Sequence, residues 1–224
     1  MNAHDDRRST NRRSFLRLLA MLGVGVQAFA RSGSVMGAIS EARASIEEDW
    51  PAMPRRRLGR TNFDASRLIF GCGAALSRGQ AVSLLDVAFD AGVNVFDVGY
   101  RDYYDDAEKN LAPFLKRTRD RVFLISKAGF ISLEPDDEVS LAQAKEGAKE
   151  WLKQMDQSLS ELQVDHVDAY YLMAVNNPAI VRSDEMYEAF LKAKRAGKVS
   201  FFGLSTHQNA QNVLQAAMET DRYD

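Results

Sequence analysis

Two ionisable residues, Asp97 and Lys127, each end a short apolar run, and Tyr100, Tyr103 and Tyr104 follow the first of these runs. A tyrosine can protonate a carbonyl oxygen when its pKa is lowered toward the working pH. A nearby lysine ammonium lowers that pKa by favouring the phenolate, and an aspartate paired with the lysine would hold the ammonium in place. These residue types fit general acid catalysis at a carbonyl, and they equally fit a structural Asp–Lys pair that ties two strands together.

The segments around these residues alternate between apolar runs and helix-like spacing. The runs that we interpret as buried strands cover 68–73, 93–97, 121–127, 167–173 and 199–205. Between them, apolar residues recur at helical spacing, as at Trp151, Met155 and Leu159. A hairpin with its turn at 59–62 is expected before the first run. This alternation predicts parallel βαβ units, in which the carboxyl ends of all strands share one edge.

Five such units are compatible with part of a (β/α)₈ TIM barrel or with a doubly wound sheet. No Gly-x-Gly-x-x-Gly follows the first strand and no Gly-Lys-Ser/Thr loop occurs, so the Rossmann and P-loop fingerprints are missing. The net charge of -2 gives no basic signature for nucleic acid. The single cysteine, Cys72, excludes an intrachain disulfide and a metal cage made of cysteines alone.

Residues 1–30 have the features of a targeting segment rather than of the fold. Arginines crowd its start, an apolar run follows, and Ala28-Phe29-Ala30 has the small-x-small form that signal peptidase cuts. The core Asn11–Arg17 resembles a twin-arginine export signal. The apolar run is shorter than the roughly 20 residues of a spanning helix. We expect export to a periplasmic or other extracytoplasmic space, with no stable membrane span after cleavage.

The remainder divides into a linker over 31–53 and a folded domain over 54–224. Within the domain, four segments resemble the aldo-keto reductase family in their order and intervals: 57–68, 92–97, 119–127 and 197–207. That family is a (β/α)₈ barrel that reduces carbonyls with NADPH. The resemblance therefore implies an α/β fold with about five of the eight barrel units. It also implies NADPH-dependent reduction of an aldehyde or ketone, with a small-molecule carbonyl substrate.

The resemblance also assigns catalytic roles. Asp97 and Lys127 match the aspartate and lysine of the family's catalytic tetrad. Asp102 stands where the tetrad tyrosine is usual. Residues 104–108 instead match the family's Tyr-Gly-x-Ser-Glu spacing, so Tyr104 is the preferred acid and Tyr103 the alternative.

Cofactor contacts are implied at Gly71, Asp97, Ser205 and Thr206, and no metal ligands are expected. Thr206 replaces the asparagine of the family's Ser-Asn pair, so Ser205 is the direct match.

The chain departs from the family at the tetrad histidine. Met173 stands there, and a thioether has no N–H with which to polarise a carbonyl. His166 begins its strand and so falls at the wrong end of a barrel, where a structural role is expected. His207 falls at the correct end and is a speculative substitute.

The second departure is length, because three barrel units do not follow residue 224. In the family that region holds the cofactor's phosphates, so weak NADPH affinity and low activity are expected. A non-catalytic binding protein and an inactive fragment of a longer enzyme are therefore the alternatives. An unclosed parallel sheet has apolar edges, and pairing with another copy or another chain would cover them.

Overall fold

The computed structural model describes residues 51–224, of which Ala52–Asp224 form one compact unit. The predicted export signal (1–30) and all but the end of the predicted linker (31–53) lie outside the described residues. Within the described part, no helix combines the length and the apolar character needed to cross a membrane.

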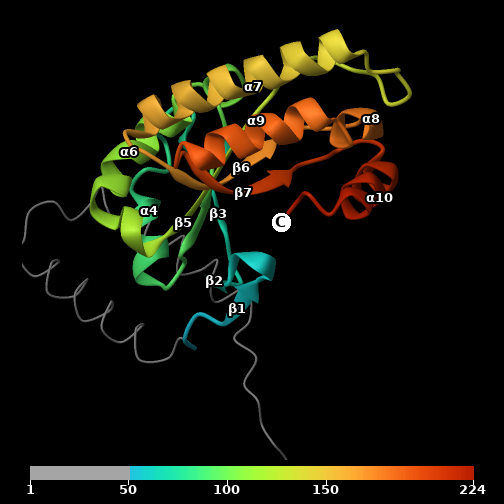
Figure 1. The fold of residues 1–224 in the computed structure, drawn as a ribbon. Coiled ribbons are helices and arrows are strands. Elements are labelled where there is room, and N and C mark those ends of the chain that lie inside the picture. Colours follow the sequence, from blue (N-terminus) through green and yellow to red (C-terminus); the bar gives the residue numbers. More distant parts are fainter. Residues whose placement is uncertain (1–50) are drawn as a thin grey trace, which may run out of the picture. The chain divides into compact units, whose positions relative to one another are not determined.

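Five parallel strands form the main sheet, in the order β3-β4-β5-β6-β7 (Figure 1). Their bounds are Phe70–Gly71 for β3, Val95–Asp97 for β4, Phe123–Ala128 for β5, Val167–Leu172 for β6 and Val199–Leu204 for β7. Each strand lies beside the next one in the sequence, which is the arrangement that successive βα units produce. The predicted α/β fold with a parallel sheet is confirmed.

The first of these strands is shorter than predicted. Only Phe70 and Gly71 pair with β4, and Leu68 and Ile69 are exposed rather than buried. The Ser66 hydroxyl donates to the Leu68 carbonyl at 2.6 Å, where the chain bends. The strand therefore starts only after this bend, and as an edge strand it has a partner on one side only.

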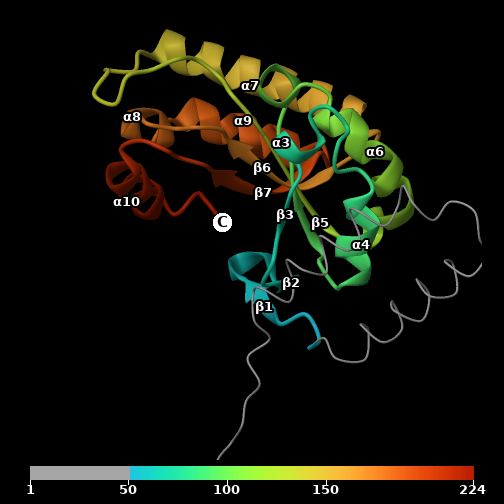
Figure 2. The same ribbon diagram turned by 180° about the vertical axis from the view of Figure 1, so that it is seen from behind.

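Helices follow every strand of the sheet, and the long ones cover one of its faces (Figures 1 and 2). The bounds are α3 Gly73–Leu76, α4 Leu84–Asp90, α5 Arg101–Tyr104, α6 Ala107–Thr118, α7 Leu141–Leu162, α8 Pro178–Val181, α9 Asp184–Arg195 and α10 Ala210–Thr220. A capping box at Ser140 and Gln143 starts α7. Trp151 of α7 is fully buried, with its ring 5.2 Å from Tyr170 and 5.5 Å from Phe202.

The opposite face of the sheet carries the predicted hairpin, β1 (Arg55–Leu58) and β2 (Phe63–Ser66), joined by a short turn. The Phe63 ring lies 5.2 Å from the ring of Phe123, at the start of β5. The Asn94 side chain accepts from the Ser66 N–H and donates to the Asp64 carbonyl. The hairpin thus covers the amino-terminal part of this face and leaves the carboxyl ends of the strands open.

Candidate active site

The structure brings Asp97 and Lys127 together on the face opposite the long helices. Asp97 at the end of β4 pairs in register with Ile125, so Lys127 lies two residues farther along β5 on the same face. The Lys127 Nζ is 2.5 Å from Asp97 Oδ1 and donates to the Val98 carbonyl at 2.8 Å. Only 9% of the Lys127 side chain is exposed, against 34% for Asp97. The ammonium is therefore held between two acceptors, and the carboxylate remains accessible.

Tyr104, the last residue of α5, lies with its ring against two glycines. A Cβ on Gly73 would come within 2.6 Å of the Tyr104 ring, and one on Gly99 within 2.9 Å. The same Cβ on Gly99 would lie 3.1 Å from the Lys127 side chain. Tyr104 and Lys127 therefore flank Gly99. Tyr103, the alternative acid, is by contrast 61% exposed.

The backbone after Tyr104 has an unusual conformation. Asp105 has φ 50° and ψ -124°, a conformation that glycine adopts readily and other residues rarely adopt. In the family's Tyr-Gly-x-Ser-Glu pattern, this position is the glycine. The local conformation thus matches the pattern that begins at Tyr104.

The pKa of the Tyr104 phenol is raised, which differs from the expected lowering by Lys127. Burial is the largest cause, followed by the neighbouring Tyr103 and by the negative charge of Asp97. Asp97 binds the Lys127 ammonium directly, so its charge offsets the positive field that the lysine would otherwise exert on the phenol. At neutral pH the phenol therefore keeps its proton.

Three of the predicted cofactor contacts lie at the ends of β3 and β7. Gly71 pairs with Asp97 and is exposed, and a Cβ on it would meet nothing within 4 Å. The Ser205 hydroxyl accepts from the Ala174 N–H at 3.1 Å. The Thr206 hydroxyl already donates to the Gln208 carbonyl at 2.8 Å. Ser205 can still donate its own hydroxyl proton to a ligand, whereas the Thr206 hydroxyl is engaged within the loop.

Met173 and the two histidines lie where the sequence places them. Met173 is buried after β6, with its N–H bonded to the Ala128 carbonyl. His166 is exposed at the start of β6, the end opposite Met173. His207 is exposed just after β7. Among the residues that the structure describes, no group of three or more His, Cys, Asp or Glu side chains could hold a metal ion.

Sequence reasoning missed Tyr171, a phenol on the same face as the Asp97–Lys127 pair. Tyr171 of β6 pairs in register with Lys127 on one side and Gly203 on the other, and its ring packs on Gly203. Burial and the Asp97 charge raise its pKa. The residue was missed because it lies inside an apolar strand. Its cross-strand position beside Lys127 is a signal that strand register could have supplied.

Three asparagines join the loops that follow β5, β6 and β7. Asn177 is buried, and its amide donates to the Glu134 and Asp137 carbonyls at 2.8 and 2.9 Å. The Asn176 side-chain amide donates to the Leu133 carbonyl at 2.8 Å. The backbone carbonyl of Asn176 accepts from the side-chain amide of Asn209 at 2.9 Å. These bonds fix the loops at the edge of the sheet where Lys127 and Ser205 lie.

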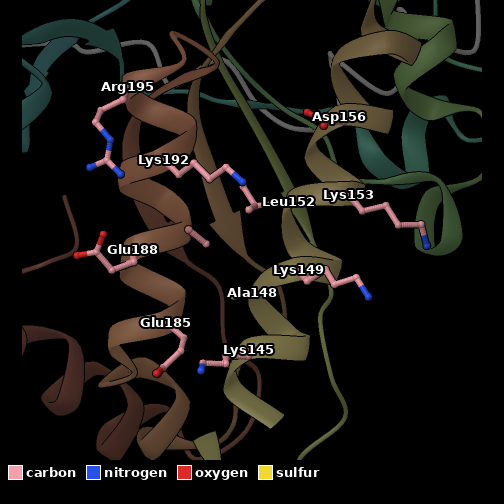
Figure 3. Close-up of a pocket in the computed structure, with 11 residues that line it drawn as sticks. Lys145, Ala148, Lys149, Leu152, Lys153, Asp156, Glu185, Glu188, Lys192 and Arg195 are labelled. Carbon is pink, nitrogen blue, oxygen red and sulfur yellow. The ribbon is translucent and has the colours of Figure 1, made fainter. Parts of the chain in front are cut away.

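A groove of about 670 Å³ lies elsewhere, between α7 and α9 (Figure 3). Lys145, Lys149 and Lys153 line it from α7, and Glu188 and Lys192 line it from α9. Both signs of charge are present, and the groove contains none of the residues at the strand ends. The groove is therefore separate from the candidate active site at the strand ends.

The family description "Aldo/keto reductase family" matches residues 67–224. The chain belongs to the aldo/keto reductase family. Among curated relatives, YqkF of Bacillus subtilis, described as an uncharacterized oxidoreductase, is 28% identical over 77% of this chain and 58% of its own length. The oxidoreductase YdhF of Escherichia coli is 30% identical over 62% of this chain and 47% of its own length. The chain thus spans about half the length of these relatives.

Solved structures of the family share the fold. The aldo-keto reductase AKR11C1 from Bacillus halodurans, in its holo form, matches with a TM-score of 0.52 and 28% identity, over 69% of this chain and 50% of that one. The thermostable aldo-keto reductase Tm1743 matches with a TM-score of 0.58 and 21% identity, over 77% of this chain and 60% of that one. The five strands are accordingly part of a TIM-barrel-like fold.

Proposed function

We propose that this aldo/keto reductase reduces an aldehyde or ketone with NADPH, with Tyr104 as the proton donor. The observation that carries the proposal is the position of Tyr104. Its ring and the Lys127 side chain both lie close to Gly99, at the carboxyl ends of parallel strands. Active sites of (β/α) barrels lie at this edge of the sheet.

The residues at this edge fit the nicotinamide end of the cofactor. Ser205 retains a hydroxyl donor for a carboxamide, and Gly71 leaves open space beside Asp97. NADPH, when bound, supplies the hydride that reduces the carbonyl carbon. Thr206 would contribute less than the asparagine it replaces, since its hydroxyl donates within its own loop.

The chain's own residues supply position and a proton. The Tyr104 phenol holds a proton at neutral pH and would donate it to the carbonyl oxygen. Asp97 and the Val98 carbonyl hold the Lys127 ammonium at the same strand ends, where it would help to stabilise negative charge that develops during proton transfer. Met173 offers no hydrogen bond to the carbonyl oxygen, so we expect turnover to be slow.

The test compares the chain with Tyr104→Phe and Tyr103→Phe in NADPH-dependent reduction of a panel of aldehydes. Loss of a general acid lowers the rate by about 10² to 10⁴, so Tyr104→Phe is expected to lose most activity. Tyr103→Phe, a matched change at an exposed ring, should retain it. Equal rates for the chain and Tyr104→Phe would contradict the role of Tyr104.

A second candidate is a non-catalytic member that binds a ligand at the same strand ends, and Met173 in place of the histidine favours it. Titration of NADPH by fluorescence separates the two functions. The second candidate predicts no binding of NADPH, so micromolar binding would contradict it, and turnover that depends on Tyr104 would exclude it.

We also propose export by the twin-arginine route, because residues 1–30 resemble such a signal. A fusion of these residues to a reporter that folds in the cytoplasm should appear outside it. Replacing Arg12 and Arg13 with lysines should retain the reporter inside. Export that survives this replacement would contradict the proposal.

A further inference from the structure

Glu108 is a buried carboxyl that the proposed reaction does not use. It is the second residue of α6 and follows Tyr104 by four positions. Its side chain has no exposed surface. A buried carboxyl is costly unless its oxygens are hydrogen-bonded, so its retention at this position requires a physical reason.

The contacts of Glu108 join two elements of the candidate site. The Ser126 hydroxyl donates to Glu108 Oε1 at 2.7 Å, and Ser126 is itself fully buried. Ser126 directly precedes Lys127 in β5 and points to the opposite face of the sheet. One hydrogen bond therefore connects the start of the helix after Tyr104 with the strand that carries Lys127.

Charged and titratable groups surround Glu108 from each element packed on it. Lys127 of β5 lies near enough to favour its carboxylate, and Glu161 of α7 lies near enough to disfavour it. The buried phenol of Tyr170 on β6 is hydrogen-bonded to Ser158 of α7 at 3.0 Å.

The second oxygen of Glu108, Oε2, has no hydrogen-bond partner among the described residues. Glu161 also has an unpartnered oxygen and pairs with Arg101 of α5 at 3.2 Å. The Ser126 hydroxyl therefore binds Oε1 directly, and the Ser158 hydroxyl of α7 also lies near enough to favour the carboxylate.

We propose that Glu108 is a positioning residue that seats Tyr104 against Gly73 and Gly99 by tying the start of α6 to β5 through Ser126. A role for Glu108 in catalysis rests on the proposed function. Its structural content, the seating of the ring, can be measured without any reaction.

The geometry explains why this bond controls the ring. Only the turn at Asp105 and Asp106 separates Tyr104 from α6, so a shift of the start of α6 moves Tyr104 with it. The ring is partly exposed and contacts both glycines closely, so a displacement away from them exposes more of it to water. Because burial is the main cause of the raised Tyr104 pKa, the titration of Tyr104 reports directly on its seating.

The experiment follows tyrosine ionisation by NMR in the full chain labelled with ¹³C at tyrosine Cζ, with Tyr104→Phe used to assign the Tyr104 signal. Ser126→Ala removes the hydrogen bond with little change in volume, and Glu108→Ala removes the carboxyl. In both variants we expect the Tyr104 pKa to fall toward its ordinary value of about 10. Glu146→Gln, a change at an exposed glutamate of α7, should leave it unchanged.

A Tyr104 pKa that stays in place in Ser126→Ala would overturn the proposal, whatever the stability of that variant. If the Tyr104 pKa falls as expected while no variant and no parent reduces an aldehyde, the positioning role stands and the proposed reaction fails. In an active enzyme, Ser126→Ala should lower kcat with a smaller effect on KM. Glu108→Gln, which keeps an acceptor for Ser126, should restore part of the loss seen in Glu108→Ala.

Discussion

At the scale of single residues, Asp105 carries a backbone conformation that its side chain disfavours, with φ 50° and ψ -124°. Residues other than glycine adopt such conformations at a cost of about 1–3 kcal/mol. The strain lies directly between the proposed acid, Tyr104, and the helix that begins at Ala107.

We therefore expect Asp105→Gly to stabilise the fold by about 1 kcal/mol, because glycine removes the strain at some cost in chain entropy. Urea unfolding measures the change. Asp102→Gly is the matched control, since Asp102 lies within α5 and glycine there should destabilise. Destabilisation by both variants would contradict the strain at Asp105.

The second prediction concerns the way in which Glu108 makes the stability of the fold depend on pH. Burial raises the pKa of Glu108 to about 7 from an ordinary 4.5, so the folded state binds a proton that the unfolded state releases between these values. The contribution of Glu108 to stability is therefore lost as the pH rises from about 4.5 to about 7, by about 3 kcal/mol in total.

Glu108→Gln removes this titration and keeps an oxygen for Ser126. The free energy of unfolding of the variant relative to the parent should rise by about 3 kcal/mol between pH 4.5 and pH 7.5. Urea unfolding at several pH values across this window measures the difference. A difference that is constant with pH would show that Glu108 is not the titrating group.

Candidate site residues at the ends of strands could be predicted from the sequence better than those inside strands and helices. Asp97 and Lys127 were identifiable because polar groups interrupt apolar runs, and the structure places them in contact. Tyr171 and Glu108 were not, because an aromatic residue in a strand and a glutamate in a helix are both ordinary. Their importance depends on strand register and on burial, which are properties of the assembled sheet.

At the scale of elements, the asparagine contacts between loops hold the edge of the sheet together. Asn177 is the central residue, because its buried amide donates to two carbonyls of the β5–α7 loop. Its side-chain oxygen accepts from the Ala179 and Ile180 N–H groups at the start of α8. One side chain thus satisfies four backbone groups.

Asn177→Ala should lower the free energy of unfolding by about 2–3 kcal/mol, because each lost bond is worth about 1 kcal/mol and some backbone groups can bond water instead. Hydrogen exchange should localise the effect to residues 129–140. Asn212→Ala, at an exposed residue of α10, is the control. Uniform loss of protection across the sheet would contradict a local role.

The elements themselves were largely predictable. The hairpin was identified from its turn at 59–62, and the last four strands of the sheet were identified from apolar runs. The short helices α3, α5 and α8 were not predicted, since four residues carry too little periodicity. The first strand was predicted too long because the bend that follows Ser66 is held by a single hydroxyl contact, which the sequence does not reveal.

At the scale of the whole molecule, both outer strands of the sheet have exposed apolar residues nearby. Leu68 and Ile69 precede β3, and Leu84 is the first residue of α4, the second helix between β3 and β4. Leu214 and Met218 are exposed on α10, which follows β7. Exposed apolar surface beside sheet edges favours association.

We propose that the described domain self-associates through these edges. Sedimentation velocity should show a mass that rises with concentration, and the double change Leu214→Glu and Met218→Glu should reduce it. Leu141→Glu, at an exposed residue at the start of α7, is the matched control. Association that the double change leaves intact would exclude the α10 surface.

The seat of Tyr104 has a consequence for binding. A ring pressed against the backbone of Gly73 and Gly99 has lost its rotamer freedom on folding, before any ligand arrives. Ordering such a side chain during association would cost about 0.5–1.5 kcal/mol. The proposed proton donor is therefore preorganised, and substrates that fit these strand ends need not spend binding energy on immobilising it.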